Sequence, residues 1–155
     1  FKGVLYVGLI LTADGPKVIE FNARFGDPET EVVLPRLKSD FYDLVEAAVD
    51  GRDCATEWSP EAYLGVVLAS KGYPGSYKKG VEIKDLDKVD AEVYHMGTKR
   101  DGDRILTAGG RVLMVVGKGK NIAEANEAAK AEISKIDCPE LFHRTDIGKA
   151  SLNQL

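Results

Sequence analysis

The sequence has few cysteines, and their positions exclude two classes of site. Cys54 and Cys138 lie far apart and belong to no Cys-x-x-Cys or Cys/His spacing. This pattern argues against a structural zinc site and against a disulfide framework. The default expectation is therefore a reducing, cytoplasmic compartment, with both thiols as buried or incidental residues.

Long apolar runs and excess positive charge are also missing. No apolar stretch approaches the roughly 20 residues that a membrane-spanning helix needs, so no membrane partner is expected. The formal net charge of -4 disfavours a nucleic-acid surface, because such surfaces cluster Lys and Arg against the phosphate backbone. The chain has no signal-peptide pattern and no initiator Met, and Phe1 falls within an apolar pattern, so we expect a fragment.

What is present fits a folded protein. Hydrophobic residues make up 44% and charged residues 30% of the 155 residues, values that exclude the disordered and fibrous classes. This length suits one compact domain, or a piece of one domain followed by a small second domain.

Two β-rich segments open the chain. Residues 4–12 and 17–25 are apolar runs joined by residues 13–16, Ala-Asp-Gly-Pro, which is typical of a hairpin turn. The pattern predicts two antiparallel strands.

Helix signals follow the hairpin. Asp27 precedes Pro28, which predicts a capping side chain and a proline at the first helical position, and Pro35 limits this short helix. A second helix is expected from Asp40 to Gly51, because apolar residues recur at helical spacing between them and glycine suits a helix end.

A boundary is expected between residues 52 and 60, where no clean period continues. The remainder predicts short strands separated by Gly-, Pro- and Asp-rich turns, followed by one helix that Asn121 and Glu124 cap. We therefore divide the chain into residues 1–57 and 58–155. The expected class is α+β, with antiparallel strands plus helices followed by a small, mostly antiparallel β domain and one C-terminal helix.

A polar set on the second strand is the first candidate site. Alternate side chains of a strand share a face, so Glu20, Asn22 and Arg24 are expected together. Mg²⁺ takes oxygen ligands from one or two carboxylates, waters and phosphates, and Arg24 can offer a fork of donors to a phosphate. The spacing alone favours the alternative, a strand edge that is polar because it faces water. The intervening residues are predicted to point into apolar packing: Ile19, Phe21, Ala23 and Phe25.

Two glycine-rich turns are the second candidate. The first lacks the Walker A spacing, but its glycines let the backbone approach a ligand and its lysine adds positive charge. The second either starts a strand or presents backbone N–H groups and a guanidinium to a substrate. A plain surface turn is an equal alternative for the first. Their residues are Lys71, Gly72, Tyr73, Pro74 and Gly75, and Gly109, Gly110 and Arg111.

The segment KVIEFNARFGDPETEVVLPRLKSD resembles the glycinamide ribonucleotide synthetase family. The resemblance continues through GVVLASKGYPGSYKKG, VYHMGT, TAGGRVLMVVGKG and FHRTDIG, and so covers nearly the whole chain. It implies that residues 1–57 are the C-terminal part of an ATP-grasp domain and that residues 58–155 are the small C-terminal domain of that family.

The resemblance also implies an activity. Enzymes of this family form a glycyl phosphate from ATP and glycine, and the amine of 5-phosphoribosylamine then displaces the phosphate to give the amide in purine synthesis. Mg²⁺ or Mn²⁺ is the implied cofactor, with Glu20 and Asn22 as its ligands. Arg24 is the implied catalytic residue, which stabilises charge on the transferring phosphoryl group.

Further roles follow from the same resemblance. Asp27 is expected to contact a substrate amino group, with helix capping as an equal alternative, and the turn at residues 71–75 is expected to help enclose phosphoribosylamine. The glycine domain and the ATP lid of the family should precede Phe1, so the chain alone should be inactive. Another ATP-grasp carboxylate–amine ligase and a truncated, non-catalytic scaffold remain alternatives.

Overall fold

The computed structural model of the chain describes residues 1–149. Residues 150–155, which close the second expected domain, lie outside this described part. The chain forms two compact units, Phe1–Ser59, here called the first unit, and Pro60 onward, here called the second unit.

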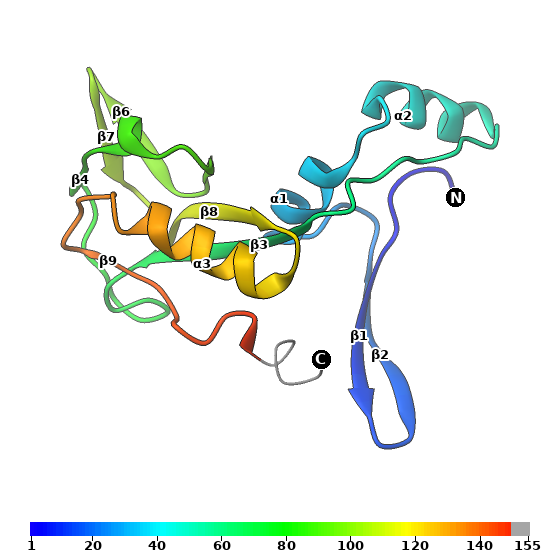
Figure 1. Cartoon of the computed structure of the whole chain (residues 1–155), viewed down its shortest axis with the longest axis horizontal. Coiled ribbons are helices and arrows are strands. Elements are labelled where there is room, and N and C mark those ends of the chain that lie inside the picture. Colours follow the sequence, from blue (N-terminus) through cyan, green and yellow to red (C-terminus); the bar gives the residue numbers. More distant parts are fainter. Residues whose placement is uncertain (150–155) are drawn as a thin grey trace. The chain divides into compact units, whose positions relative to one another are not determined.

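The first unit opens with a long two-stranded antiparallel ribbon, as predicted (Figure 1). Strand β1 is Tyr6–Thr12 and strand β2 is Gly15–Asn22. Thr12 lies opposite Gly15, so the turn itself is only the pair at positions 13 and 14. Leu9 lies opposite Val18, but Gly8 lies opposite Glu20. Ile19 is therefore an extra residue on β2, a β-bulge.

The helix expected to start at Asp27-Pro28 starts later. Helix α1 is Thr30–Val33, its N-cap residue is Glu29, and a 3₁₀ turn, η1, continues it over Leu34–Arg36. The peptide bond between Asp27 and Pro28 is cis, and the backbone N–H and hydroxyl of Thr30 both donate to the Gly26 carbonyl. The Gly26 carbonyl thus occupies the role predicted for the Asp27 side chain, and that part of the prediction is wrong.

Helix α2, Phe41–Asp50, has the predicted start and end. The Asp40 carboxylate accepts hydrogen bonds from the backbone N–H groups of Tyr42 (2.7 Å) and Asp43 (3.3 Å). Gly51 closes the helix in the left-handed conformation at φ 71°, which favours glycine.

The apolar side of the ribbon is largely uncovered. Ile19 and Phe21 are 65% and 64% exposed, and Ala23 is exposed as well. The prediction that they point into apolar packing is therefore wrong, because a two-stranded ribbon has no second layer of its own. Phe25 alone of the predicted set is half-buried, and its ring lies 5.9 Å from that of Phe41.

The second unit contains two antiparallel sheets (Figure 1). The four-stranded sheet has the order β5 (Glu92–His95), β8 (Arg111–Gly119), β3 (Ala62–Ser70) and β9 (Leu141–Phe142). The three-stranded sheet has the order β4 (Glu82–Ile83), β7 (Arg104–Thr107) and β6 (Thr98–Asp101), with a 3₁₀ turn, η2, at Leu86–Lys88.

Helix α3, Ile122–Ile133, lies across β8 and β3 (Figure 1). Asn121 caps it by accepting a hydrogen bond from the backbone N–H of Glu124 at 3.0 Å, as predicted. A side chain at Gly117 could not fit, because its Cβ would lie 2.0 Å from the Ala125 carbonyl oxygen. The core between sheet and helix is formed by buried aliphatic residues, among them Leu64, Val66, Leu68, Leu113, Val115, Ala125, Ala129 and Ile133.

The end of the described chain returns to the beginning of the second unit. The side-chain amide of Asn126 on α3 donates to the Ile147 carbonyl at 2.6 Å. A Cβ at Gly148 would lie 2.7 Å from a methyl group of Leu64 on β3. The last described turn is therefore packed against the first strand of the same unit.

Within the described chain, no helix is long and apolar enough to cross a bilayer.

Candidate functional site

The first candidate site lies at the base of the ribbon. Asn22 donates a hydrogen bond from its side-chain amide to the Glu20 carboxylate at 2.9 Å. Strand alternation places these two side chains on one face, and the hydrogen bond shows that they meet there. Glu20 is exposed and Asn22 is half-buried, so both are open to a ligand from solvent.

Two residues that sequence analysis did not single out join this face. The β1–β2 register places Tyr6 opposite Asn22, and the Tyr6 hydroxyl donates to the Glu29 carboxylate at 3.3 Å. The negative charge of Glu29 is the main cause that raises the pKa of Tyr6; Glu20 acts in the same direction and Arg24 opposes it. The charges of Glu29, Glu20 and Arg24 therefore all act on the Tyr6 hydroxyl.

Arg24 lies beyond the end of β2, the strand that holds Glu20 and Asn22. Strand β2 ends at Asn22, and the Arg24 guanidinium donates to the neighbouring Phe25 carbonyl at 2.9 Å. Asp27 is exposed at the cis peptide bond that follows. A hollow of about 300 Å³ lies in the same region, lined by Tyr6, Gly26 and Glu29 among others.

The donor set of this face suits a hard divalent cation. A carboxylate and an amide side chain can supply oxygen ligands, which Mg²⁺ and Mn²⁺ accept, and an amide turns its oxygen or its nitrogen outward with little change in shape. Among residues 1–149, no group of three or more His, Cys, Asp and Glu side chains is arranged to hold a metal. Glu20 and Asn22 fit a partial site that substrate oxygens would complete.

The second candidate site forms where the two predicted turns meet. Ser70, the last residue of β3, donates its backbone N–H to Gly110 and its hydroxyl to Gly109, each at 2.8 Å. Tyr73, in the first turn, lies directly over Gly110, where a Cβ would be 2.2 Å from the Tyr73 ring. Residues about 40 positions apart in sequence thus form one surface.

Glycines shape this surface in different ways. Gly72 has φ 95°, and a Cβ there would lie 2.2 Å from the Ser76 carbonyl oxygen, so the tight turn requires glycine. The backbone N–H of Gly109 donates to the Gly97 carbonyl at 3.0 Å. The expectation that this turn presents its N–H groups to a substrate is therefore wrong for Gly109, because Gly97 already uses that donor.

Several members of the second site were missed. Ser70 and Gly97 hold residues 109 and 110, and Tyr77 lies with its ring 6.3 Å from that of Tyr73 in an edge-on arrangement. The ring of Tyr77 also lies 5.5 Å from the Lys79 ammonium. The alternation of tyrosine, glycine and lysine in the first turn was the available sequence signal, but only folding shows which glycine each ring covers.

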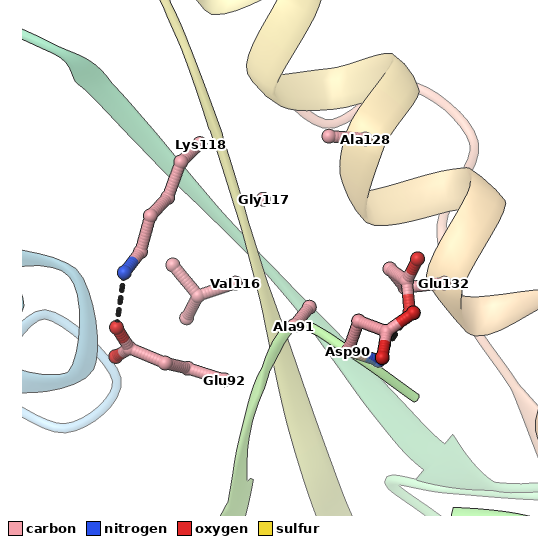
Figure 2. A pocket seen from close by; sticks show the side chains of 8 residues that line it. All are labelled: Asp90, Ala91, Glu92, Val116, Gly117, Lys118, Ala128 and Glu132. Carbon is pink, nitrogen blue, oxygen red and sulfur yellow. Dashed lines mark hydrogen bonds and ion pairs between the residues drawn. The ribbon is translucent and has the colours of Figure 1, made fainter. Parts of the chain in front are cut away.

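A separate hollow of about 270 Å³ lies between β5, β8 and α3 and contains no predicted site residue (Figure 2). Lys118 forms an ion pair with Glu92 on one side. On the other side Glu132 accepts the backbone N–H of Asp90 at 2.7 Å and pairs with Lys135 at 2.8 Å. The charged side chains around this hollow form ion pairs and hydrogen bonds with neighbouring protein groups, which is typical of a structural role.

Comparison with known families gives matches over both units. A family model described as "Phosphoribosylglycinamide synthetase, C domain" matches residues 63–150. A second model, "Phosphoribosylglycinamide synthetase, ATP-grasp (A) domain", matches residues 1–30.

Relatives of known sequence and structure agree with these matches. Phosphoribosylamine–glycine ligase of Halalkalibacterium halodurans is 53% identical over 154 residues, covering 98% of this chain and 36% of the relative. The ligase of Caldanaerobacter subterraneus subsp. tengcongensis is 51% identical over 150 residues, covering 95% of this chain and 36% of the relative. A crystal structure of phosphoribosylamine–glycine ligase from Thermotoga maritima matches with a TM-score of 0.81 and 33% identity, covering 92% of this chain and 36% of that chain. The chain thus spans about a third of the length of these relatives.

Proposed function

This chain belongs to the phosphoribosylglycinamide synthetase family, and we propose that it supplies the C-terminal part of a ligase that joins glycine to 5-phosphoribosylamine with ATP. The products would be glycinamide ribonucleotide, ADP and phosphate. The observation that carries the proposal is the Glu20–Asn22 pair, two oxygen-bearing side chains held together on one exposed strand face in a region that matches an ATP-grasp domain.

Glu20 and Asn22 would hold Mg²⁺ or Mn²⁺ at the ATP phosphates. A bound divalent cation would neutralise phosphate charge and orient the terminal phosphoryl group toward the glycine carboxylate. Arg24, two residues beyond the end of β2, would give up its hydrogen bond to the Phe25 carbonyl and bind the transferring phosphoryl group instead. Asp27 would contact the amino group of a substrate as an exposed carboxylate.

The second candidate site would bind 5-phosphoribosylamine. Residues 71–75 are exposed and lie against the half-buried residues 109–111, and the glycines of the first turn let a polar ligand approach its backbone. The remaining two-thirds of the ligase, which the relatives contain, would supply the glycine and ATP-covering parts. Cys54 and Cys138 are free thiols, as suits a cytoplasmic enzyme.

The test is a chimera in which this chain replaces the matching C-terminal segment of the Halalkalibacterium halodurans ligase. We expect ADP release that requires glycine, phosphoribosylamine and a divalent cation together. Glu20→Gln and Asn22→Ala should each raise the metal concentration needed for half-maximal rate by about tenfold or more, as for loss of a charge-assisted contact. Lys17→Ala, on the exposed outer part of the same strand, is the matched control.

Three outcomes would contradict the proposal. An unchanged metal dependence in both variants would remove the metal site from Glu20 and Asn22. A chimera that couples other carboxylates as fast as glycine would identify a different ATP-grasp ligase, and a folded chimera without ligase activity would identify a non-catalytic scaffold.

A further inference from the structure

The Tyr6 side chain links the Glu20–Asn22 pair to a second carboxylate, that of Glu29. Tyr6 lies opposite Asn22 in the β1–β2 register. Gly8 lies opposite Glu20, so these alternate positions of the two strands share one face. A Cβ at Gly8 would lie 3.3 Å from Cγ of Glu20 and 3.7 Å from Cε1 of Tyr6. The Tyr6 ring therefore lies near the Glu20 side chain, while its hydroxyl donates to Glu29 at 3.3 Å.

The Glu29 carboxylate is held in place from two sides. Its Oε1 accepts the hydrogen bond from the Tyr6 hydroxyl. Its Oε2 lies over Gly26, where a Cβ would be only 2.3 Å away. Gly26 is buried, and its carbonyl accepts the backbone N–H and the hydroxyl of Thr30 at the start of α1. The position of this carboxylate thus depends on one hydroxyl group and on the lack of a side chain at Gly26.

Glu20 and Glu29 bring two negative charges to this region, and over residues 1–149 neither forms an ion pair. Their side-chain partners are Asn22 and Tyr6, which are neutral donors. The charge of Glu29, and then that of Glu20, raises the pKa of Tyr6, so the hydroxyl remains a proton donor at neutral pH. The charge of Arg24 opposes this shift without reversing it. Neighbouring carboxylates disfavour each other's charged form, and a bound cation would remove this cost.

We propose that Glu29 is a positioning residue for the divalent cation, whose bound water donates hydrogen bonds to the Glu29 carboxylate, and that Tyr6 holds this carboxylate in place. Mg²⁺ held by one or two side chains keeps several waters, and these waters need acceptors. Groups that hydrogen-bond to metal ligands commonly contribute about 10- to 100-fold to metal affinity. The inference rests on the metal site of the proposed function, but it concerns two residues to which that function gives no role.

The test measures metal binding directly in the chimera that carries this chain, saturated with a non-hydrolysable ATP analogue. Mn²⁺ is titrated, and loss of the EPR signal of the free ion gives the dissociation constant. Broadening of the bound Mn²⁺ signal in water enriched in oxygen-17 reports how many waters the ion retains. Circular dichroism and thermal unfolding show whether each variant keeps its fold.

Glu29→Ala should weaken Mn²⁺ binding about tenfold or more. Tyr6→Phe and Gly26→Ala should each weaken it about three- to tenfold, because the carboxylate remains but is no longer held in place. Tyr6→Phe should have no further effect in the Glu29→Ala background, because Tyr6 acts through Glu29. The number of bound waters should rise in Glu20→Ala, which removes a direct ligand, but not in Glu29→Ala.

Two residues of the first unit provide matched controls. Tyr42 on α2 is 71% exposed, and Tyr42→Phe removes the same hydroxyl group away from the ribbon. Asp14 is exposed in the turn at the far end of the ribbon from Asn22, and Asp14→Ala removes the same charge as Glu29→Ala. Both variants should leave the Mn²⁺ dissociation constant within about twofold of the parent value, because distant exposed charges are screened.

Other results would overturn the inference. Unchanged Mn²⁺ binding in Tyr6→Phe and Glu29→Ala, with a loss in Glu20→Ala, would refute it and leave the proposed function intact. A higher number of bound waters in Glu29→Ala would make Glu29 a direct ligand, and an equal loss in Asp14→Ala would show only general charge attraction. No Mn²⁺ binding by the parent chimera would remove the metal site and this inference with it. The expected Mn²⁺ pattern in a chimera that forms no product would refute the proposed function alone.

Discussion

The two units of this chain treat their apolar residues in opposite ways. In the described part of the second unit, thirteen hydrophobic residues are buried, and several of them, such as Val112, Leu113 and Val115, have no exposure. In the described part of the first unit, the buried hydrophobic residue is Ala47, while side chains such as Leu11 and Val49 are 80% and 60% exposed. An apolar pattern therefore identifies a face, but burial depends on whether a second layer covers that face.

This contrast bears on function as well as stability. The second unit can position its two turns with a core of its own, because both sides of the Tyr73–Gly110 contact belong to it. The ribbon that carries Glu20 and Asn22 has no comparable layer behind it. We therefore expect the two candidate sites to differ in how rigidly the isolated chain holds them.

The largest expected effect contrasts one leucine from each unit. Leu113→Ala removes a fully buried side chain and should lower the free energy of unfolding by about 2–5 kcal/mol. Leu11→Ala removes a side chain that is 80% exposed and should change it by less than about 0.5 kcal/mol. Denaturant unfolding of the full chain measures both, and equal losses would mean that the ribbon is covered in solution.

Two glycines give a smaller but sharper contrast. A Cβ at Gly117 would meet backbone atoms of α3, including the Ala129 nitrogen at 2.5 Å, so Gly117→Ala should cost about 1–3 kcal/mol. At Gly8 the nearest atom is the flexible Cγ of Glu20 at 3.3 Å, and strand interiors favour alanine over glycine, so Gly8→Ala should be neutral or slightly stabilising. A neutral Gly117→Ala in thermal unfolding would show that α3 is free to move away from β8.

The two capped helices provide the next contrast. Asn121→Ala and Asp40→Ala each remove a side chain that accepts backbone N–H bonds, a change worth about 1 kcal/mol. Helix α3 is packed on a sheet, so loss of its cap in Asn121→Ala should lower the free energy of global unfolding of the second unit. Helix α2 has exposed apolar residues, namely Phe41, Tyr42, Val45 and Val49. Loss of its cap in Asp40→Ala should therefore appear as faster amide exchange in α2 alone. If Asn121→Ala and Asp40→Ala each changed amide exchange over the whole of their own unit, this expected difference would be contradicted.

The smallest expected effect is on acid stability. Burial raises the pKa of Glu92, but hydrogen bonds from Lys118 and Tyr94 and the charge of Lys118 outweigh it, so the pKa lies below its usual value. A depressed carboxyl pKa contributes stability above the unfolded value, and this contribution is lost as the pH falls through the folded pKa. Glu92→Gln should therefore flatten the acid limb of the stability profile by about 0.2–1 kcal/mol.

Glu57 is the control for this pH series. It lies 3.6 Å from Lys38 in the first unit and is 75% exposed. Glu57→Gln should leave the acid limb unchanged, because exposed pairs contribute little. If Glu57→Gln flattened the acid limb of the stability profile as much as Glu92→Gln, the expected difference between the Glu92–Lys118 and Glu57–Lys38 pairs would be contradicted.

Local signals in the sequence predicted the local structure. The capping aspartate and the closing glycine define α2, and strand alternation brings Glu20 and Asn22 together. The register of the ribbon could not be read in this way. Plain pairing from the two-residue turn would place Phe21 opposite Tyr6, whereas the bulge at Ile19 places Asn22 there and so brings the Tyr6 hydroxyl into the site.

Contacts between distant segments were also beyond the sequence. Strand β6, Thr98–Asp101, has charged residues on successive positions and no apolar alternation, and β9 has only two residues, so neither gave a strand signal. The meeting of the two glycine-rich turns depends on the pairing of β3 with β8. The Gly109 N–H has its backbone partner in Gly97, which lies between β5 and β6, and the glycine pattern alone did not indicate this contact.

The return of Gly148 to Leu64 has a practical consequence for protein engineering. The last described turn packs against the first strand of the second unit, so the two ends of the described part of that unit are neighbours. Units with neighbouring ends can be grafted into a loop of a host protein or circularly permuted with a short linker. The surface formed by the two glycine-rich turns could thus be transplanted as one module, separate from the ribbon that carries Glu20 and Asn22.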